Sequence, residues 1–243
     1  MNTVPGLAAL GPYFAVEHHP AGAVIPPSWR TFEDLATDPD VLRERVGTVR
    51  HGLAAIGGLP EETIETRVAA SVAHLGVTAR LISPALAVAA ESGLVLDLAP
   101  GETWWQPVSG GPIPVSIHSP QFARSVSDIE KLAARLAENV FDGPIRALGE
   151  AFARLSVSRQ ILWGNVASAL HGAATVLDRE RPEWTDRTRA LTASLRHRAP
   201  LAGTGEVDTQ GRFRRRSCCL IYRAAPGGSG PVCGDCVLAG NRR

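Results

Sequence analysis

Residues 158–177 read SRQILWGNVASALHGAATVL, and this stretch predicts the central helix of the fold. Ser158 is a typical helix N-cap, and apolar residues from Ile161 to Leu177 occupy nearly every face of the helix that follows. A helix that is apolar almost all the way round is normally surrounded by other elements. We therefore expect residues 158–177 to lie in the middle of the hydrophobic core.

Helical periodicity also occurs on both sides of this stretch. Apolar residues recur at three- and four-residue steps, and several segments begin at residues that favour helix starts, such as Asp38, Pro60 and Pro182. Ser127, with Glu130 three residues later, has the pattern of a capping box. The expected helices cover residues 38–51, 60–76, 77–90, 127–140, 143–155 and 182–198.

The pattern changes after Gly93. Three short apolar segments follow, separated by turns that contain glycine and proline, and they lie at residues 94–98, 104–105 and 115–117. They predict a small antiparallel β meander over about residues 94–118, with Trp104 and Trp105 in the core. The fold class is therefore expected to be α+β and predominantly α-helical.

The two ends of the chain lack regular periodicity. Residues 1–30 contain five prolines and are expected to be irregular. Residues 200–243 are rich in glycine and have too little apolar pattern to form a core of their own. We therefore expect a mainly helical scaffold and substrate-docking domain over residues 1–199, followed by an irregular C-terminal segment over residues 200–243.

The composition limits the classes of protein to consider. The 243 residues are 44% hydrophobic and 20% charged, as in a folded chain, and the formal net charge of +1 gives no overall field that would attract nucleic acid. Residues 1–15 lack the basic start of a signal peptide, and the best apolar run, residues 81–90, is too short to span a membrane. We expect a soluble cytoplasmic protein that binds no nucleic acid and has no membrane span; peripheral membrane association stays open.

All four cysteines lie near the C-terminal end, at Cys218, Cys219, Cys233 and Cys236, and the 217 residues before them contain none. A secreted fold stapled by disulfides would spread its cysteines along the chain, whereas clustered cysteines in a reducing compartment usually serve metal or redox chemistry. Four thiolates satisfy either a tetrahedral Zn²⁺ or a [2Fe–2S] cluster, which takes two thiolates per iron.

The spacing of the two cysteine pairs favours the cluster over zinc. Cys233 and Cys236 form a Cys-x-x-Cys motif, in which Gly234 is expected to support a tight turn by adopting a positive φ. Adjacent cysteines are unusual at zinc sites because neighbouring side chains diverge, whereas a two-iron cluster has two separate attachment points. A redox-active cysteine pair and four free thiols stay open as alternatives.

The residues around the cysteines resemble a known family, the FhuF-type ferric-siderophore reductases. The similarity to the C-terminal [2Fe–2S] motif of that family lies in Arg215-Arg216-Ser217-Cys218-Cys219, Tyr222-Arg223 and Cys233-Gly234-Asp235-Cys236. The thirteen residues between the two pairs are more than the family has, and the extra length lies in the loop of residues 224–232. Residues 162–165, Leu-Trp-Gly-Asn, resemble the central helix of the same family more weakly.

The resemblance implies a [2Fe–2S] cluster held by the four cysteines. It also implies an enzyme, a ferric-siderophore reductase, that transfers one electron to Fe(III) in a siderophore and releases Fe(II), without catalytic acid–base residues. The electron donor must be external, a ferredoxin or an NAD(P)H-dependent reductase, because Gly203-Thr204-Gly205 lacks the context of a dinucleotide site. The alternative is a zinc-stapled or cluster-containing accessory or electron-transfer protein of siderophore metabolism without reductase activity.

Several further residues are candidates for tuning the cluster or binding the substrate. Residues 212–243 carry seven arginines against one acidic residue, so this segment is basic in a nearly neutral chain. Its charge is expected to offset a negative cluster and to attract an anionic ferric chelate. Asn165 is expected either to line a substrate cavity or to bond to buried backbone. The full set is Arg215, Arg216, Tyr222, Arg223, Gly234, Asp235 and Asn165.

Overall fold

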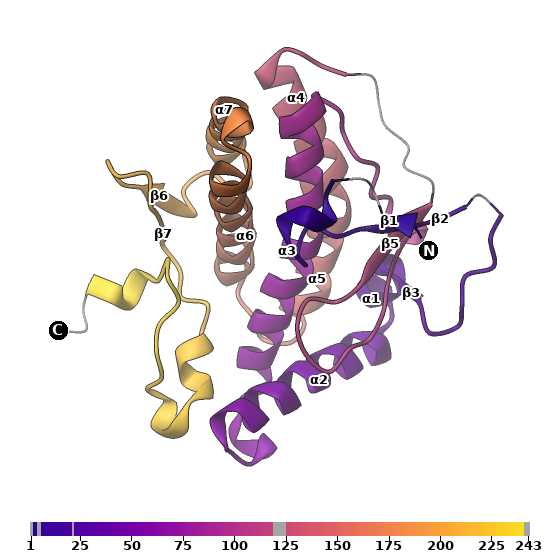
Figure 1. The fold of residues 1–243 in the computed structure, drawn as a ribbon. Coiled ribbons are helices and arrows are strands. Elements are labelled where there is room, and N and C mark those ends of the chain that lie inside the picture. The colour runs from indigo at the N-terminus through magenta and orange to yellow at the C-terminus, as the bar shows by residue number, and fades with distance from the viewer. Residues whose placement is uncertain (1, 4–5, 21, 119–124, 241–243) are drawn as a thin grey trace.

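Two long helices, α3 (Thr66–Ser92) and α6 (Arg159–Glu180), pack against each other at the centre of the molecule (Figure 1). The computed structural model of the chain describes residues 2–3, 6–20, 22–118 and 125–240. The hydroxyl of Ser158 caps α6 by accepting a hydrogen bond from the amide of Ile161 at 3.3 Å. Most of the apolar side chains of α6 are buried, which confirms that residues 158–177 form a central helix.

Helix α3 is one continuous helix where the sequence predicts two. Gly76, the expected end of the first helix, lies inside it, and so does Pro84. A glycine in a helix interior costs about 1 kcal/mol relative to alanine. Apolar residues on both sides of Gly76, such as Val68 and Leu81, are almost completely buried. Their burial outweighs the cost of the glycine and keeps the helix intact.

Helix α3 also changes the expectation about membrane spans. Within the described residues it is the one helix that is long and apolar enough to cross a membrane by length and composition. However, 78% of its most apolar window is buried inside the protein, as in the core helix of a soluble protein. The helix continues well beyond the apolar run of residues 81–90, but its burial fits the expectation that it does not span a membrane.

The remaining helices surround this pair. They are α1 (Phe32–Thr37), α2 (Pro39–Gly57), α4 (Ile129–Leu136), α5 (Arg146–Ala153) and α7 (Thr185–His197). A wide helical turn, Ala137–Ile145, joins α4 to α5. Asp128, not Ser127, caps α4, because its carboxylate accepts a hydrogen bond from the amide of Lys131 at 2.8 Å. A carboxylate at this position also interacts favourably with the helix dipole, which explains the shift by one residue.

A small mixed sheet lies on the side of the helices opposite to the C-terminal segment (Figure 1). Its strand order is β1-β2-β5-β4-β3, with bounds Asn2–Thr3, Glu17–His19, Val115–His118, Thr103–Trp105 and Arg30–Thr31. Strands β4 and β5 pair antiparallel, as the meander predicts, and Trp104 and Trp105 are buried. Residues 94–98 do not form the third strand, because β3 and the parallel neighbour β2, both from the N-terminal region, occupy the flanking positions.

The buried guanidinium of Arg80 fixes the N-terminal region to α3. Arg80 is 2% exposed and donates hydrogen bonds to the carbonyl oxygens of Ile113 at 2.7 Å, of Ala15 at 2.6 Å and of Tyr13. One side chain of α3 thus holds two segments that have no helical structure. This anchor explains how proline-rich residues near the N-terminus join an ordered sheet.

Replacing Arg80 with leucine is expected to lower the free energy of unfolding by about 2–4 kcal/mol, because three carbonyl oxygens lose a charged donor. Urea denaturation followed by circular dichroism measures this loss. Arg43→Leu is the control, since Arg43 is 65% exposed and loses only a surface ion pair with Asp40, worth about 0.5 kcal/mol or less. Equal losses in the two variants would contradict the anchoring role of Arg80.

Candidate metal centre

The four cysteines lie in a C-terminal segment that packs beside α6 and one end of α3 (Figure 1). The segment begins with a hairpin of β6 (Gly205–Val207) and β7 (Phe213–Arg215), which pair antiparallel. The cysteine-bearing part that follows contains only short turns, η6 (Ile221–Ala224), η7 (Pro226–Gly228) and η8 (Val237–Gly240). The expectation of an irregular C-terminal segment is confirmed; the boundary between residues 199 and 200 stays a prediction.

The two cysteine pairs come together through Cys219 and Cys233, whose sulfur atoms are 3.4 Å apart. Two sulfurs that share one tetrahedral metal, with bonds of about 2.3 Å, lie about 3.8 Å apart. Cys219 and Cys236 are buried, and Cys218 and Cys233 are partly exposed. One cysteine of each pair therefore lies near the distance required of two ligands on one metal.

Backbone amides approach the other two sulfurs. The amide of Leu220 donates to the sulfur of Cys218 at 3.3 Å, and the amide of Leu238 donates to the sulfur of Cys236 at 3.3 Å. Hydrogen bonds of this kind stabilise thiolates and adjust the potential of iron–sulfur clusters. In the residues that the structure describes, no three His, Cys, Asp or Glu side chains converge on one point, and the closest sulfur contact, between Cys219 and Cys233, joins one cysteine of each pair. A two-iron cluster, which takes two thiolates per iron, fits this donor set.

The thiols affect each other's protonation. A hydrogen bond joins the sulfurs of Cys219 and Cys233, and it lowers the pKa of Cys219 and raises that of Cys233. Burial raises the pKa of Cys218. The positive charge of Arg215 acts in the opposite sense on Cys218 and adds to the lowering at Cys219. Of Cys218, Cys219 and Cys233, Cys219 is the one whose pKa is lowered, so its sulfur holds a negative charge most readily.

The adjacent cysteines, Cys218 and Cys219, are attached to helix α3. The hydroxyl of Ser71 in α3 donates to the carbonyl oxygen of Cys219 at 2.8 Å. The next residue, Leu220, has a φ of +70°, a left-handed conformation that is rare for a bulky side chain and is found mainly where surrounding structure imposes it. Neither Ser71 nor Leu220 is a candidate in the sequence: nothing there marks a contact across 148 residues or a left-handed leucine.

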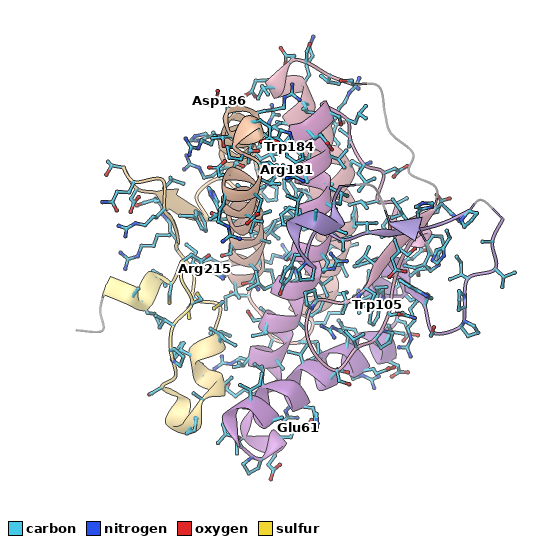
Figure 2. The ribbon with its side chains drawn as sticks, in the orientation of Figure 1. Glu61, Trp105, Arg181, Trp184, Asp186 and Arg215 are labelled. Atoms are coloured by element: carbon cyan, nitrogen blue, oxygen red, sulfur yellow. The ribbon has the colours of Figure 1, made fainter. Side chains whose placement is uncertain are left out.

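Asn165 in α6 bonds to buried backbone, which is one of the two roles expected for it. Its side chain is fully buried and donates to the carbonyl oxygen of Ser71 at 2.9 Å, while its oxygen accepts from Arg215 at 2.8 Å. Arg215 also donates to the hydroxyl of Ser217 at 3.3 Å and is 1% exposed. Figure 2 shows Arg215 at the junction of the C-terminal segment and the helices. Asn165 thus joins α3, α6 and the cysteine segment rather than lining a substrate cavity.

Gly164 makes this close approach possible. A Cβ atom at Gly164 would lie 2.8 Å from Nη2 of Arg215 and closer still to the hydroxyl of Ser217. The glycine therefore leaves the space on α6 into which both side chains of the C-terminal segment fit.

The Cys-x-x-Cys turn is attached to the same helix. The amide of Cys236 donates to the carbonyl oxygen of Cys233 at 3.2 Å, and the carboxylate of Asp235 accepts a hydrogen bond from the hydroxyl of Ser168 in α6. Gly234 lies in this turn, as expected, but it is not among the glycines with a positive φ, so that reason for its presence is wrong. A backbone hydrogen bond between neighbouring cysteines closes the turn without a left-handed residue.

The exposed arginines near the cysteines are mostly paired with carboxylates. Three ion pairs form, Arg216–Glu206 at 2.6 Å, Arg223–Glu65 at 2.6 Å and Arg212–Asp208 at 2.9 Å. Their partners lie outside residues 212–243, so the segment is less basic in the fold than the sequence count indicates. The carbonyl oxygen of Tyr222 accepts a hydrogen bond from the amide of Gly230 at 2.7 Å and shapes the intervening loop. Arg242 and Arg243 lie outside the described residues.

The donor set and the close sulfur pair fit a metal centre with cysteine ligands that is attached to a helical scaffold. Residues 215–238 match the family model of the FhuF 2Fe-2S C-terminal domain, and the matched range includes all four cysteines. The resemblance is thus confirmed for this segment, and its cofactor is a [2Fe–2S] cluster.

The other comparisons add little to this match. No curated protein matches the chain. A solved structure of the aerobactin synthetase IucC from a hypervirulent pathotype of Klebsiella pneumoniae is similar over 58% of this chain, with 16% identity and a TM-score of 0.38. The chain spans 28% of the length of that synthetase.

Replacing Gly164 with alanine is expected to lower the free energy of unfolding by about 1–3 kcal/mol and to reduce cluster retention, because the added methyl group displaces Arg215 and Ser217. Thermal unfolding and the ratio of cluster absorbance to protein absorbance measure the two effects. Gly172→Ala is the matched control: it lies in the same helix, its Cβ would contact nothing within 4 Å, and alanine there should stabilise by about 0.5–1 kcal/mol. A stabilised Gly164→Ala protein with a full cluster would contradict the packing role of Gly164.

Proposed function

We propose that this protein is a ferric-siderophore reductase that transfers one electron to Fe(III) in a siderophore and releases Fe(II) in the cytoplasm. The observation that carries the proposal is the match of residues 215–238 to the FhuF 2Fe-2S C-terminal domain, in a segment where the cysteine pairs meet. The proposed activity is that of an oxidoreductase acting on a metal ion, within iron homeostasis.

The chemistry of iron explains why one electron is sufficient. Fe(III) is a hard cation that oxygen donors of a siderophore hold tightly, and Fe(II) is held much more weakly by the same ligands. The [2Fe–2S] cluster, when bound, supplies a single electron. The residues of this chain bind and orient it: Cys218, Cys219, Cys233 and Cys236 are the proposed ligands, and the amides of Leu220 and Leu238 donate to two of the sulfurs.

The exposure of the cysteines supports electron transfer to a molecule outside the protein. Cys218 and Cys233 are partly exposed, whereas Cys219 and Cys236 are buried. A ferric siderophore and an external donor, a ferredoxin or an NAD(P)H-dependent reductase, are the proposed partners on the exposed side. No proton transfer or covalent intermediate with the chain is required for this reaction.

The ligand assignment is tested by replacing each of the four cysteines with serine. Each variant, purified without oxygen, is expected to lose most of its visible absorption and its stoichiometric iron and sulfide, because serine is a poor ligand for iron–sulfur clusters. Iron, zinc and acid-labile sulfide are measured on the wild-type protein in parallel. Stoichiometric zinc without iron or sulfide in the anaerobic wild type would favour the zinc-stapled alternative.

The reductase activity is tested in a single turnover. Chemically reduced protein is mixed without oxygen with ferric hydroxamate, catecholate and carboxylate siderophores in turn, and cluster absorbance and captured Fe(II) are followed together. We expect at least one siderophore to reoxidise the cluster in a saturable manner, with one Fe(II) trapped per electron lost. If no siderophore reoxidises an intact cluster, the protein is an accessory or electron-transfer protein instead.

A further inference from the structure

Arg215 is a buried charge that has no charged partner among the residues the structure describes. It is 1% exposed, and its hydrogen-bond acceptors are the neutral oxygens of Asn165 at 2.8 Å, Ile161 at 3.2 Å and Ser217 at 3.3 Å. In the described residues, its Nε and Nη1 atoms have no hydrogen-bond partner, and no carboxylate lies within 4.0 Å of the guanidinium. A buried charge left in this state is strongly destabilising.

The buried ring of His74 does not compensate the charge of Arg215. His74 in α3 is 1% exposed, and burial lowers its pKa to about 3, with the charge of Arg215 contributing to the lowering. His74 is therefore neutral at physiological pH. The carboxylate of Asp235, which belongs to the Cys-x-x-Cys turn, is directed to the hydroxyl of Ser168.

Arg215 lies between the two halves of the cysteine motif. Its amide donates to the carbonyl oxygen of Asp235 at 3.0 Å, so its backbone adjoins the Cys-x-x-Cys turn. Its side chain contacts Ser217, which directly precedes the vicinal cysteines. Through Asn165 it is also connected to Ser71, which holds the carbonyl oxygen of Cys219. Its positive charge also acts on the sulfurs of Cys218 and Cys219, where it favours the thiolate.

We propose that Arg215 is the internal counter-charge of the cluster and raises its reduction potential. The four thiolates make the cluster negative, and reduction adds one further negative charge, so a fixed positive charge nearby stabilises the reduced form more than the oxidised form. Water cannot screen Arg215 as it screens a surface arginine. Asn165 is a positioning residue that holds the guanidinium in place. This inference rests on the cluster alone and not on the proposed reductase activity.

The first test compares Arg215→Gln with Arg214→Gln by redox titration of the cluster, followed by visible absorption and electron paramagnetic resonance. Arg214 is the matched control, because it carries the same charge on the same strand but is exposed. Arg215→Gln is expected to make the potential more negative by at least a tenfold change in the one-electron equilibrium, about 59 mV. Arg214→Gln is expected to cause a much smaller shift that disappears at high salt. Equal shifts in the two variants overturn the proposal.

Two further variants keep the test decisive if Arg215→Gln does not retain its cluster. Asn165→Asp places a carboxylate against the guanidinium and is expected to make the potential more negative while Arg215 remains present. Arg215→Lys keeps the charge and is expected to hold the potential closer to the wild-type value than Asn165→Asp does. An unchanged potential in Asn165→Asp with an intact cluster overturns the proposal. The titration uses no siderophore, so its result is independent of the single-turnover assay.

Discussion

The contact between the guanidinium of Arg215 and helix α6 determines where the C-terminal segment lies. It requires a glycine at position 164, an amide at Asn165 and a hydroxyl at Ser71, which come from the two helices at the centre of the core. Residues of the two core helices therefore also contact the segment that carries the cysteines. The scaffold is more than a support to which the site is attached, because its innermost polar side chains reach the cysteine loop.

The helices could be predicted from the sequence because their buried apolar residues recur at steps of three and four positions. The apolar residues that follow Ser158 on nearly every face of the helix mark α6, and Ser158 is its N-cap as predicted. The sheet was less predictable, since strands of two to four residues, such as Arg30–Thr31, are too short to show alternation. Gly76 lies inside a helix and does not end it, because helix propensity is a local property, whereas the packing that overrides it comes from residues distant in the chain.

The site was predictable in its chemistry but not in its surroundings. The spacing of Cys218, Cys219, Cys233 and Cys236 identifies the donor set, because thiolates are rare and their grouping has few uses. The charge balance around them could not be counted from a window of sequence, since Arg223 pairs with Glu65, which lies in a distant part of the sequence. The role of Asn165 also depended on Arg215, a contact that only the tertiary structure shows.

The hydrogen bond from Ser71 to the carbonyl oxygen of Cys219 has a consequence for the lifetime of the protein. A group that binds only the native state stabilises it by mass action, and here the binding segment is attached directly to the longest buried helix. Assembly of the cofactor and survival of the fold are thus thermodynamically linked. A chain that has not bound its cluster therefore lacks this part of its stability.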